Sequence, residues 1–473
     1  MKSCIRDILF VLVWLVIFAI ATVLKESIAI TIVSIIFLIY FYIDKESEYL
    51  YPLIILVMLD YPGYFYFGLT DNILNISFFK LSLTELFSII AIMKYGLSTN
   101  GKKNLFLQPY KLYISYYVVL ITIGIAEGMK LSGTSGRGYS VYSSLLTLFL
   151  LYPLFLTMPK LYKNKLYIDR TIEILNIMVI LNIILQIYHI ITGASLASRF
   201  GGLGSVSTPE DLIRPVYGTY ICFITLVFSI YKIGIRQGNI IWHYLILVLS
   251  FGSILISATR GWILACVLMI FISWFVISKL KIHELFKNTS IILVIILIFM
   301  QFNIINSQVH KSMERLSTIE LIFKGDPTAG GTNARLTERH YPVMNKFYEK
   351  PIIGWGFSAV GYDSYDVHVG NQSLLMVGGI IGYTIVIICL LWIIMIIYKS
   401  KREAIKNNVK QIYDLYIISF LSLFVIHSTS TDLFSFMASA IGYHYKKLFF
   451  LAIYLSMLNS YIYVDKHNNN KNL

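Results

Sequence analysis

The segment from Leu374 to Tyr398 reads LLMVGGIIGYTIVIICLLWIIMIIY and contains no charged residue. Because an α-helix rises about 1.5 Å per residue, a run of this length can cross the roughly 30 Å hydrocarbon core of a bilayer. Apolar runs long enough to cross recur along the whole chain. The sequence therefore predicts an all-α polytopic membrane protein.

The composition agrees with this class of protein. Hydrophobic residues make up 57% of the chain and charged residues 14%, whereas soluble domains average about 45–50% and about 25%. We expect about 12–14 transmembrane helices from the apolar runs that are long enough to span. The candidate spans are residues 7–24, 27–43, 49–68, 78–96, 110–126, 143–158, 171–192, 215–231, 240–257, 261–278, 288–305, 371–398, 411–428 and 447–464.

These spans divide the chain into three regions. Residues 1–305 hold eleven candidate spans, residues 306–370 form one long polar connection, and residues 371–473 hold the last spans and a short tail. The first apolar run continues through Lys25 and Glu26 into a second span, so we interpret it as an uncleaved helix and not as a signal peptide.

Basic residues are concentrated in alternate short connections and in both tails. The positive-inside rule then places both termini in the cytoplasm and residues 306–370 on the outer face of the cytoplasmic membrane. This outer loop is itself basic, with Arg335, Arg339, Lys346 and Lys350 among its residues. Positive charge kept on the side where the rule predicts little of it suggests a functional role.

Several classes of function are disfavoured. The net charge of +14 is spread over inter-span loops and not gathered on a soluble face, so we expect no nucleic-acid partner. The cysteines Cys4, Cys222, Cys266 and Cys389 show no CxxC spacing, which predicts neither a disulfide framework nor a metal site. No P-loop, HExxH or Gly-x-Ser-x-Gly motif occurs, and we expect no cofactor and no metal.

Within the outer loop, residues 333–349 have helical periodicity. One narrow apolar face is formed by Leu336, His340, Val343 and Phe347. Arg335 and Arg339 lie four residues apart along its edge, which predicts an amphipathic helix lying in the outer interface. We expect Pro342 to break or kink this helix.

Five outward arginines are candidates for binding a diphosphate: Arg199, Arg214, Arg260, Arg335 and Arg339. A guanidinium group binds oxygen in a planar fork and stays charged at physiological pH, which suits a diphosphate. The alternative for Arg260, in the turn between two spans, is an anchor whose charge reaches the headgroup layer. For Arg335 and Arg339 the alternative is a solvated helix face that contacts phospholipid headgroups.

His368 precedes the last long apolar run and is a candidate general base, because a histidine can accept a proton near neutral pH. A structural role is the alternative. Asp363, Asp366, Glu338 and His340 are alternative candidates for the base, or they are ordinary surface groups. We also count Asp366 among the candidate sugar-binding residues.

Candidate sugar ligands follow from hydrogen-bonding capacity. Asn371 and Gln372 can hold a sugar hydroxyl or cap the helix that starts near them, and Glu338 and Asp366 can accept from hydroxyls. Trp355 can stack on a sugar ring or lie in the aromatic belt of the membrane interface. The run Pro351-Ile-Ile-Gly-Trp-Gly356 predicts a tight turn whose glycines permit positive φ.

These motifs together resemble the O-antigen ligase and polymerase superfamily of bacterial membrane glycosyltransferases. Ser257-Ala-Thr-Arg260-Gly261 is similar to the family's Ser-x-Ser-Arg-Gly motif, and Arg335 with Pro351–Gly356 resembles its Arg-bearing helix and Pro-x-x-Gly-x-Gly turn. His368-Val-Gly-Asn371 is similar to its His-Asn-x-x-Leu segment, with Val369 and Gly370 inserted here. Arg199-Phe-Gly-Gly resembles an Arg-x-x-Gly of an earlier loop, although Pro209-Glu210 replaces the family's Pro-Asn.

The resemblance implies a GT-C-like, metal-independent, inverting glycosyltransferase that uses an undecaprenyl-diphosphate-linked oligosaccharide. In that case the arginines would hold the diphosphate and His368 would deprotonate or orient the acceptor hydroxyl. Of the two activities we favour the polymerase, which joins repeat units, over the ligase, which transfers glycan to another acceptor. The implied partners are a flippase and a chain-length regulator, besides the lipid bilayer.

Two other classes of function compete with this one. A lipid-linked oligosaccharide flippase or other transporter predicts charges buried within spans and two related halves, and the sequence shows no internal repeat. A membrane-embedded sensor or assembly subunit predicts that Arg260 and His368 are dispensable.

Overall fold

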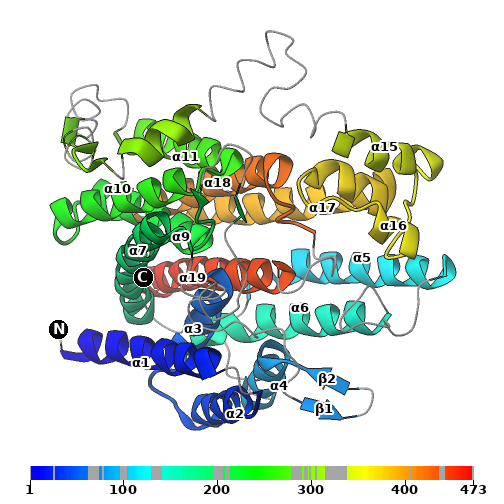
Figure 1. The fold of residues 1–473 in the computed structure, drawn as a ribbon, viewed down its shortest axis with the longest axis horizontal. Helices are drawn as coiled ribbons and strands as arrows, with labels where there is room; N and C mark the ends of the chain where they lie inside the picture. The colour runs from blue at the N-terminus through cyan, green and yellow to red at the C-terminus, as the bar shows by residue number, and fades with distance from the viewer. Residues whose placement is uncertain are drawn as a thin grey trace.

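The computed structural model describes most of the chain (Figure 1). The described residues are 2–24, 27–61, 74–76, 79–95, 104–128, 141–162, 165–194, 206–207, 213–278, 290–291, 294, 297, 300–303, 306–314, 338–404, 407–435 and 443–470. Arg199 and Arg335 lie outside them, as does most of the predicted span 288–305.

The described elements are helices and two short antiparallel hairpins, β1–β2 and β3–β4. In chain order they are α1 (Lys2–Leu24), α2 (Ser27–Ile43), α3 (Leu50–Asp60), β1 (Leu74–Ile76), β2 (Phe79–Leu81), α4 (Leu83–Tyr95), α5 (Leu107–Ala126), α6 (Val141–Leu161), α7 (Lys165–Thr192), β3 (Val206–Ser207), β4 (Ile213–Arg214), α9 (Thr219–Gly234), α10 (Ile240–Ile256), α11 (Arg260–Ser278), α15 (His340–Glu349), α16 (Ala359–Asp363), α17 (Gly370–Glu403), α18 (Asn407–Thr429) and α19 (Tyr443–Asn470).

By length and composition, 5 of the described helices can cross a membrane: Cys4–Leu24, Leu107–Ala126, Lys165–Thr192, Gly370–Glu403 and Val409–Thr429. Other apolar helices, including α2, α9, α10 and α11, are shorter. This is the architecture of a helical membrane protein. Each predicted span other than 288–305 overlaps a described helix.

Two predicted spans have different bounds. The span predicted over 49–68 contains α3, which ends at Asp60. The Asp60 carboxylate accepts from the backbone N–H groups of Tyr220 and Ile221 at the start of α9. The span predicted over 78–96 begins with strand β2, and its helix starts only at Leu83. There Glu85 accepts from the backbone N–H of Ser82 at 2.6 Å, which is half of a capping box.

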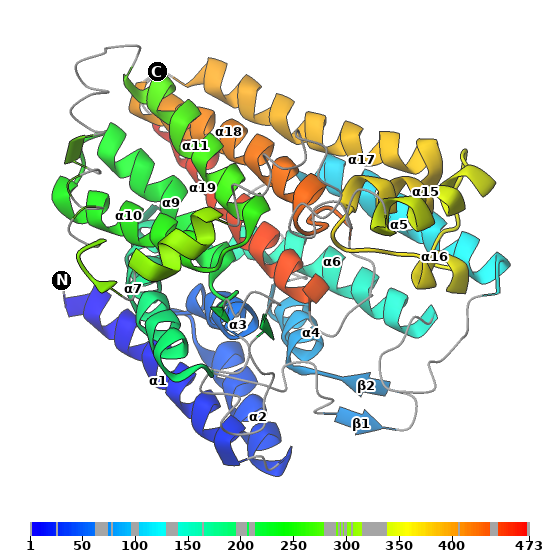
Figure 2. The same ribbon diagram turned by 45° about the horizontal axis from the view of Figure 1, so that its top comes forward.

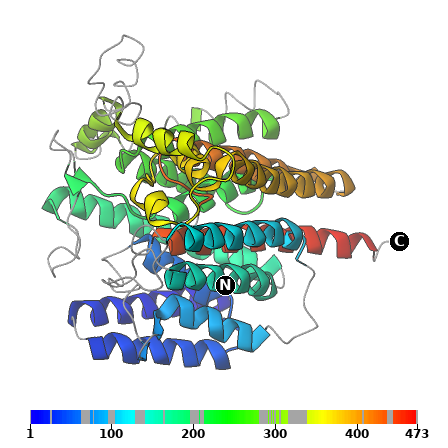
Figure 3. The same cartoon turned by 90° about the vertical axis from the view of Figure 1, so that its right-hand side faces the viewer.

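The helices are arranged in layers (Figure 3), with the blue α1 and α2 along one edge and the orange α17 and α18 towards the other. Helices α11, α18, α17 and α5 pack each against the next. In Figure 1 the start of α1 and the end of α19 lie at the left, and α15 and α16 lie at the right. Figure 2 shows α15 and α16 beside one end of α17 and the end of α5.

Helix α15 confirms the amphipathic helix over its described part. It begins at His340, and its two buried residues are Val343 and Phe347, both on the predicted apolar face. Within the described part of the predicted run, residues 338 and 339 are π-helical and the α-helix begins only at His340, two residues before Pro342. Pro342 lies in the first turn of α15, where a backbone N–H has no acceptor within the helix and where proline is tolerated.

Helix α17 is interrupted at Gly379, whose φ is 63° and ψ is −169°. The interruption frees backbone groups that the helix can no longer pair, and the 351–356 turn binds them. Trp355 and Gly356 donate to the carbonyls of Met376 and Val377 at 3.0 and 2.8 Å. On the other side of the break, Ile380 donates to the Pro351 carbonyl at 2.8 Å. Irregular backbone inside a membrane protein is stable only when such groups are satisfied internally.

The glycines of this turn are required by the close approach of two backbones. Gly354 and Gly356 have φ values of 70° and 57°, which confirms the predicted positive φ. A Cβ at Gly354 would lie 2.4 Å from the Val377 carbonyl oxygen. The 351–356 turn therefore locks α15 onto α17.

Replacing Gly354 by alanine should weaken this lock. We expect Gly354→Ala to lower the free energy of unfolding by at least about 1–3 kcal/mol, because it adds a left-handed alanine to a steric overlap. Thermal unfolding of the detergent-solubilised protein measures it. Gly252→Ala in α10 is the matched control, since a Cβ there meets nothing within 4 Å. Equal melting temperatures for the two variants would contradict the lock.

Candidate functional site

The last residues of α18 and those just after it, His427–Asp432, contact the segments that carry several of the predicted site residues. We call them the α18 end. Gly261 lies so close that a Cβ there would be 2.5 Å from the Ser430 Cβ, and a Cβ at Gly370 would be 2.3 Å from the His427 carbonyl oxygen. Thus the starts of α11 and α17, far apart in sequence, meet on one short segment.

His368 is anchored to the α18 end by its ring. Its Nδ1 lies 3.0 Å from the Ser430 carbonyl oxygen, and its backbone N–H donates to Asp366 Oδ1 at 2.8 Å. A carbonyl oxygen can only accept, so Nδ1 is assigned the proton. In the neutral form of the half-buried ring, Nε2 would then carry the lone pair.

Arg339 lies on the other side of Asp366. Its Nη1 is 3.6 Å from Asp366 Oδ2, with side-chain exposures of 43% and 23%. The Asp366 backbone is fixed in turn, since Ser373 Oγ donates to its carbonyl at 2.7 Å. Arg339, Asp366 and His368 therefore form one cluster. Glu338, the residue before Arg339, is exposed.

Arg260 and Arg214 lie on two segments that meet at Thr259. Arg260 is the first residue of α11, and Arg214 Nη2 donates to Thr259 Oγ1 at 3.3 Å. Ala258, in the turn before them, has a φ of 50°, a conformation that is uncommon for a non-glycine residue. A chain of contacts thus connects Arg214 through Thr259–Gly261 and Ser430 to His368.

A polar stripe on α7 holds the segment that follows Arg214. Asn182 Nδ2 donates to the Tyr217 carbonyl at 3.2 Å, and Gln186 Nε2 donates to the Pro215 carbonyl at 3.1 Å. His189 pairs through Nδ1 with the Tyr217 hydroxyl. We did not predict these residues from the sequence. The signal was three polar side chains at helical spacing within an apolar span.

A second group that sequence reasoning missed is a set of buried carboxylates bound by the first turn of α19. Tyr445 donates to Glu85, Lys446 pairs with Asp60 and Lys447 pairs with Asp432. The three acids are 0% exposed. No periodicity in the sequence indicates which acid meets which cation.

Asp432 connects this group to the site. Its backbone N–H donates to the Val367 carbonyl at 3.0 Å, and its carboxylate accepts from the Tyr365 hydroxyl. Burial raises the pKa of Asp432, and Lys447 opposes that shift. Burial, and then Asp432, raise the pKa of Tyr365 well above its ordinary value, so Tyr365 stays protonated and can donate.

The remaining predicted ligands occupy different surroundings. Asn371 does not cap α17, because the N-cap residue is Val369 and no side chain makes a capping hydrogen bond there. The Nδ2 of Asn371 instead donates to Ser428 Oγ at 2.8 Å. Gln372 has a buried Oε1 that receives no hydrogen bond from the described residues. Trp355 donates to the Lys346 carbonyl at 2.8 Å, and Lys350 Nζ lies 4.2 Å from the centre of its ring.

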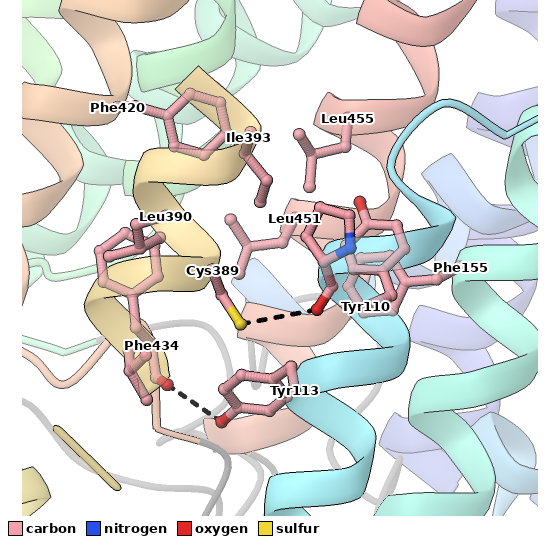
Figure 4. Close-up of a pocket in the computed structure, with 12 residues that line it drawn as sticks. Tyr110, Tyr113, Phe155, Cys389, Leu390, Ile393, Phe420, Phe434, Leu451 and Leu455 are labelled. Atoms are coloured by element: carbon pink, nitrogen blue, oxygen red, sulfur yellow. Dashed lines mark hydrogen bonds between the residues drawn. The ribbon is translucent and has the colours of Figure 1, made fainter. Parts of the chain in front are cut away.

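An apolar pocket lies between α5, α6, α17, α18 and α19 (Figure 4). Its cavity volume is about 60 Å³. The Tyr113 hydroxyl donates to the Phe434 carbonyl at 3.0 Å at one side of it, and Cys389 contributes from α17. Phe434 also contacts the His427 ring, with centroids 5.3 Å apart, which joins the pocket to the α18 end.

Metal ligands are not grouped in the part of the chain that the structure describes, where no cluster of three or more His, Cys, Asp or Glu residues could hold an ion. The segments that meet at the α18 end carry guanidinium groups, the imidazoles of His368 and His427, the Asp366 carboxylate and the Asn371 amide. Such a set can bind a polyanion and can remove a proton from a hydroxyl group.

The contact between Gly261 and Ser430 provides a test of the site's assembly. We expect Gly261→Ala to lower the free energy of unfolding by about 1–3 kcal/mol, because overpacking separates α11 from α18. The double variant Gly261→Ala with Ser430→Gly removes the opposing Cβ and should recover part of the loss. Additive effects of the two changes in thermal unfolding would contradict this contact.

No protein-family model, curated protein or solved structure matches this chain. The family resemblance therefore rests on the motifs quoted from the sequence, and function must be inferred from the site.

Proposed function

We propose that this protein is a polysaccharide polymerase that joins undecaprenyl-diphosphate-linked oligosaccharide units on the outer face of the cytoplasmic membrane. The observation that carries the proposal is that the segments carrying Arg260 and His368 meet at the α18 end. Gly261, the residue after Arg260, packs against Ser430, and the Ser430 carbonyl holds the His368 ring. A segment with a cation and a segment with a candidate base thus contact the same residue.

The chemistry requires these two groups and no nucleotide. The acceptor hydroxyl loses its proton to His368 Nε2 as its oxygen forms a bond to the anomeric carbon of the donor. The bond from that carbon to the diphosphate breaks, and the electron pair leaves with the diphosphate. Arg260 and Arg339 stabilise the negative charge that develops on the leaving group, which is an electrostatic contribution aimed at the transition state. Arg214 binds the diphosphate equally in the ground state and in the transition state. Attack opposite the leaving group inverts the anomeric centre.

The topology of the proposal has both termini in the cytoplasm and α15 and α16 outside. In support, the start of α1 and the end of α19 lie at the end of the helical assembly opposite to α15 and α16 (Figure 1). The same proposal includes a GT-C-like fold, 12–14 transmembrane helices and a location in the inner membrane. The number of helices is the one predicted from the apolar runs in the sequence.

The apolar pocket of Figure 4 supports a lipid-linked donor. In the proposal it takes part of the isoprenoid chain, because its lining is apolar and Phe434 connects it to the α18 end. A transporter would instead move the whole molecule across the bilayer. The sugar ligands remain Asn371, Gln372, Asp366, Glu338 and Trp355.

Reconstitution tests the activity. Purified protein in lipid vesicles, given undecaprenyl-diphosphate-linked units without nucleotide or metal, should produce a size ladder of polymer. We expect His368→Ala, Arg260→Ala and Arg339→Ala each to lower the rate by about 10²-fold or more without reducing the amount of protein in the membrane.

The controls for this experiment come from the same chain. His310→Ala replaces a histidine that is 74% exposed and pairs with Glu314, and Arg402→Ala replaces an exposed arginine in the last turn of α17. Both should keep wild-type rates. Transfer only to an added second acceptor would indicate a ligase, and substrate crossing the bilayer without any product would indicate a flippase.

Filling the pocket tests where the isoprenoid chain lies. We expect Cys389→Phe to lower turnover of a donor with a C55 chain at least about tenfold more than turnover of a C10 analogue, because the longer chain occupies more of the pocket. Cys389→Ala keeps the pocket open and serves as the control. Equal losses with both donors would place the chain elsewhere.

A further inference from the structure

Lys446 and Lys447, adjacent in the first turn of α19, each bind a buried carboxylate on a different side of the candidate site. Lys446 Nζ lies 2.7 Å from Asp60 Oδ1, and Lys447 Nζ pairs with Asp432 Oδ1. Both lysines are buried, with side-chain exposures of 11% and 3%. A buried lysine in an apolar interior is costly unless it is paired, so neither can swing away freely.

The Lys446 contact leads to the arginine side of the site. Asp60 Oδ2 accepts from the backbone N–H groups of Tyr220 and Ile221 at 3.1 and 3.2 Å, and the Asp60 carbonyl accepts from Gly218 at 3.0 Å. Lys446 Nζ also lies 4.8 Å from the centre of the Tyr220 ring. Asp60 therefore fixes the entry into α9, which directly follows the segment that begins with Arg214.

The Lys447 contact leads to the histidine side. Asp432 accepts from the Tyr365 hydroxyl through its carboxylate and donates through its backbone to the Val367 carbonyl. These two contacts lie on either side of Asp366 and immediately before His368. Asp432 therefore fixes the short segment between α16 and α17 that carries the base.

We propose that Lys446 and Lys447 are positioning residues with separate tasks: Lys446 holds the Arg214 side, which binds diphosphate, and Lys447 holds the His368 side, which performs the chemistry. The inference rests on the proposed function for its kinetic form. A purely architectural role for the first turn of α19 predicts that loss of either lysine disturbs both sides together.

Kinetics of Lys446→Met and Lys447→Met separate these two roles. Lys446→Met should raise KM for the lipid-linked donor by roughly tenfold or more and change kcat little, since uniform binding is lost. Lys447→Met should lower kcat by about 10²-fold and change KM little, because misplacement of the base affects only the chemical step. Parallel changes of KM and kcat in both variants would overturn the proposal.

Amide hydrogen exchange tests the same division without any turnover. Lys446→Met should increase exchange in residues 213–222 and leave residues 364–370 as in the wild type. Lys447→Met should show the reverse pattern. If the wild-type protein makes no polymer, the proposed function fails while this exchange pattern still decides the positioning roles. Uniform exchange over both segments overturns them.

Matched variants guard against loss of folding. Lys232→Met removes a comparably buried lysine that pairs with Asp169 at 2.8 Å in the last turn of α9, and it should alter neither segment. The double variants Asp60→Asn with Lys446→Met and Asp432→Asn with Lys447→Met remove both charges of a pair, so no buried charge is left alone. Each double variant should show increased amide exchange in the same segment as its lysine variant, but to a smaller extent. Increased exchange in the other segment would contradict the assignment.

Discussion

The structure depends most on the need to pair charges that have been removed from water. The first turn of α19 places a hydroxyl group and two ammonium groups against Glu85, Asp60 and Asp432, which are all fully buried. Removing one partner of such a pair costs about 3–5 kcal/mol, because an uncompensated charge remains in a low-dielectric interior. Helix α19 is therefore fixed at once to α4, to α3 and to the connection after α18, and this constraint orders elements that are distant in the chain.

In the candidate site, too, a few contacts bring together segments that are distant in the chain. Its functional groups come from the start of α11, the start of α17 and the residue before α15, and the α18 end contacts the first two of these directly. Small residues make this convergence sterically feasible, since any side chain at Gly261 or Gly370 would overlap the α18 end. The interrupted α17 has the matching role towards α15. The carbonyl groups of Met376 and Val377, which the break leaves without helical partners, accept hydrogen bonds from the 351–356 turn. Because α15 lies between Arg339 and this turn, the contact helps to position Arg339.

Sequence reasoning predicted those features that local patterns determine. The apolar runs predicted the helices, the spacing of Val343 and Phe347 predicted the buried face of α15, and Gly354 and Gly356 predicted positive φ. It did not predict features that depend on partners far away in the chain. The break at Gly379 is stabilised by residues 351–356, and the pairing of Lys446 with Asp60 joins opposite ends of the sequence. The contact between Asp60, at the end of α3, and the start of α9 is also of this kind. The capping box at Ser82 and Glu85 is the exception, a local signal that could have corrected the start of α4.

The strengths of the ion pairs divide the site into fixed and exchangeable charges. Asp432 and Lys447 are buried, and Tyr365 binds the same carboxylate, so their arrangement persists whatever occupies the site. Arg339 and Asp366 are 3.6 Å apart and partly exposed, and a pair of that kind contributes only about 0–1 kcal/mol. A diphosphate offers Arg339 more oxygen atoms and more negative charge than one carboxylate, so it can displace Asp366 at little cost. Asp366 would still hold the backbone N–H of His368 through its other oxygen, Oδ1. In the proposed reaction, the cation that would bind the leaving group could thus move while the proposed base stays in place.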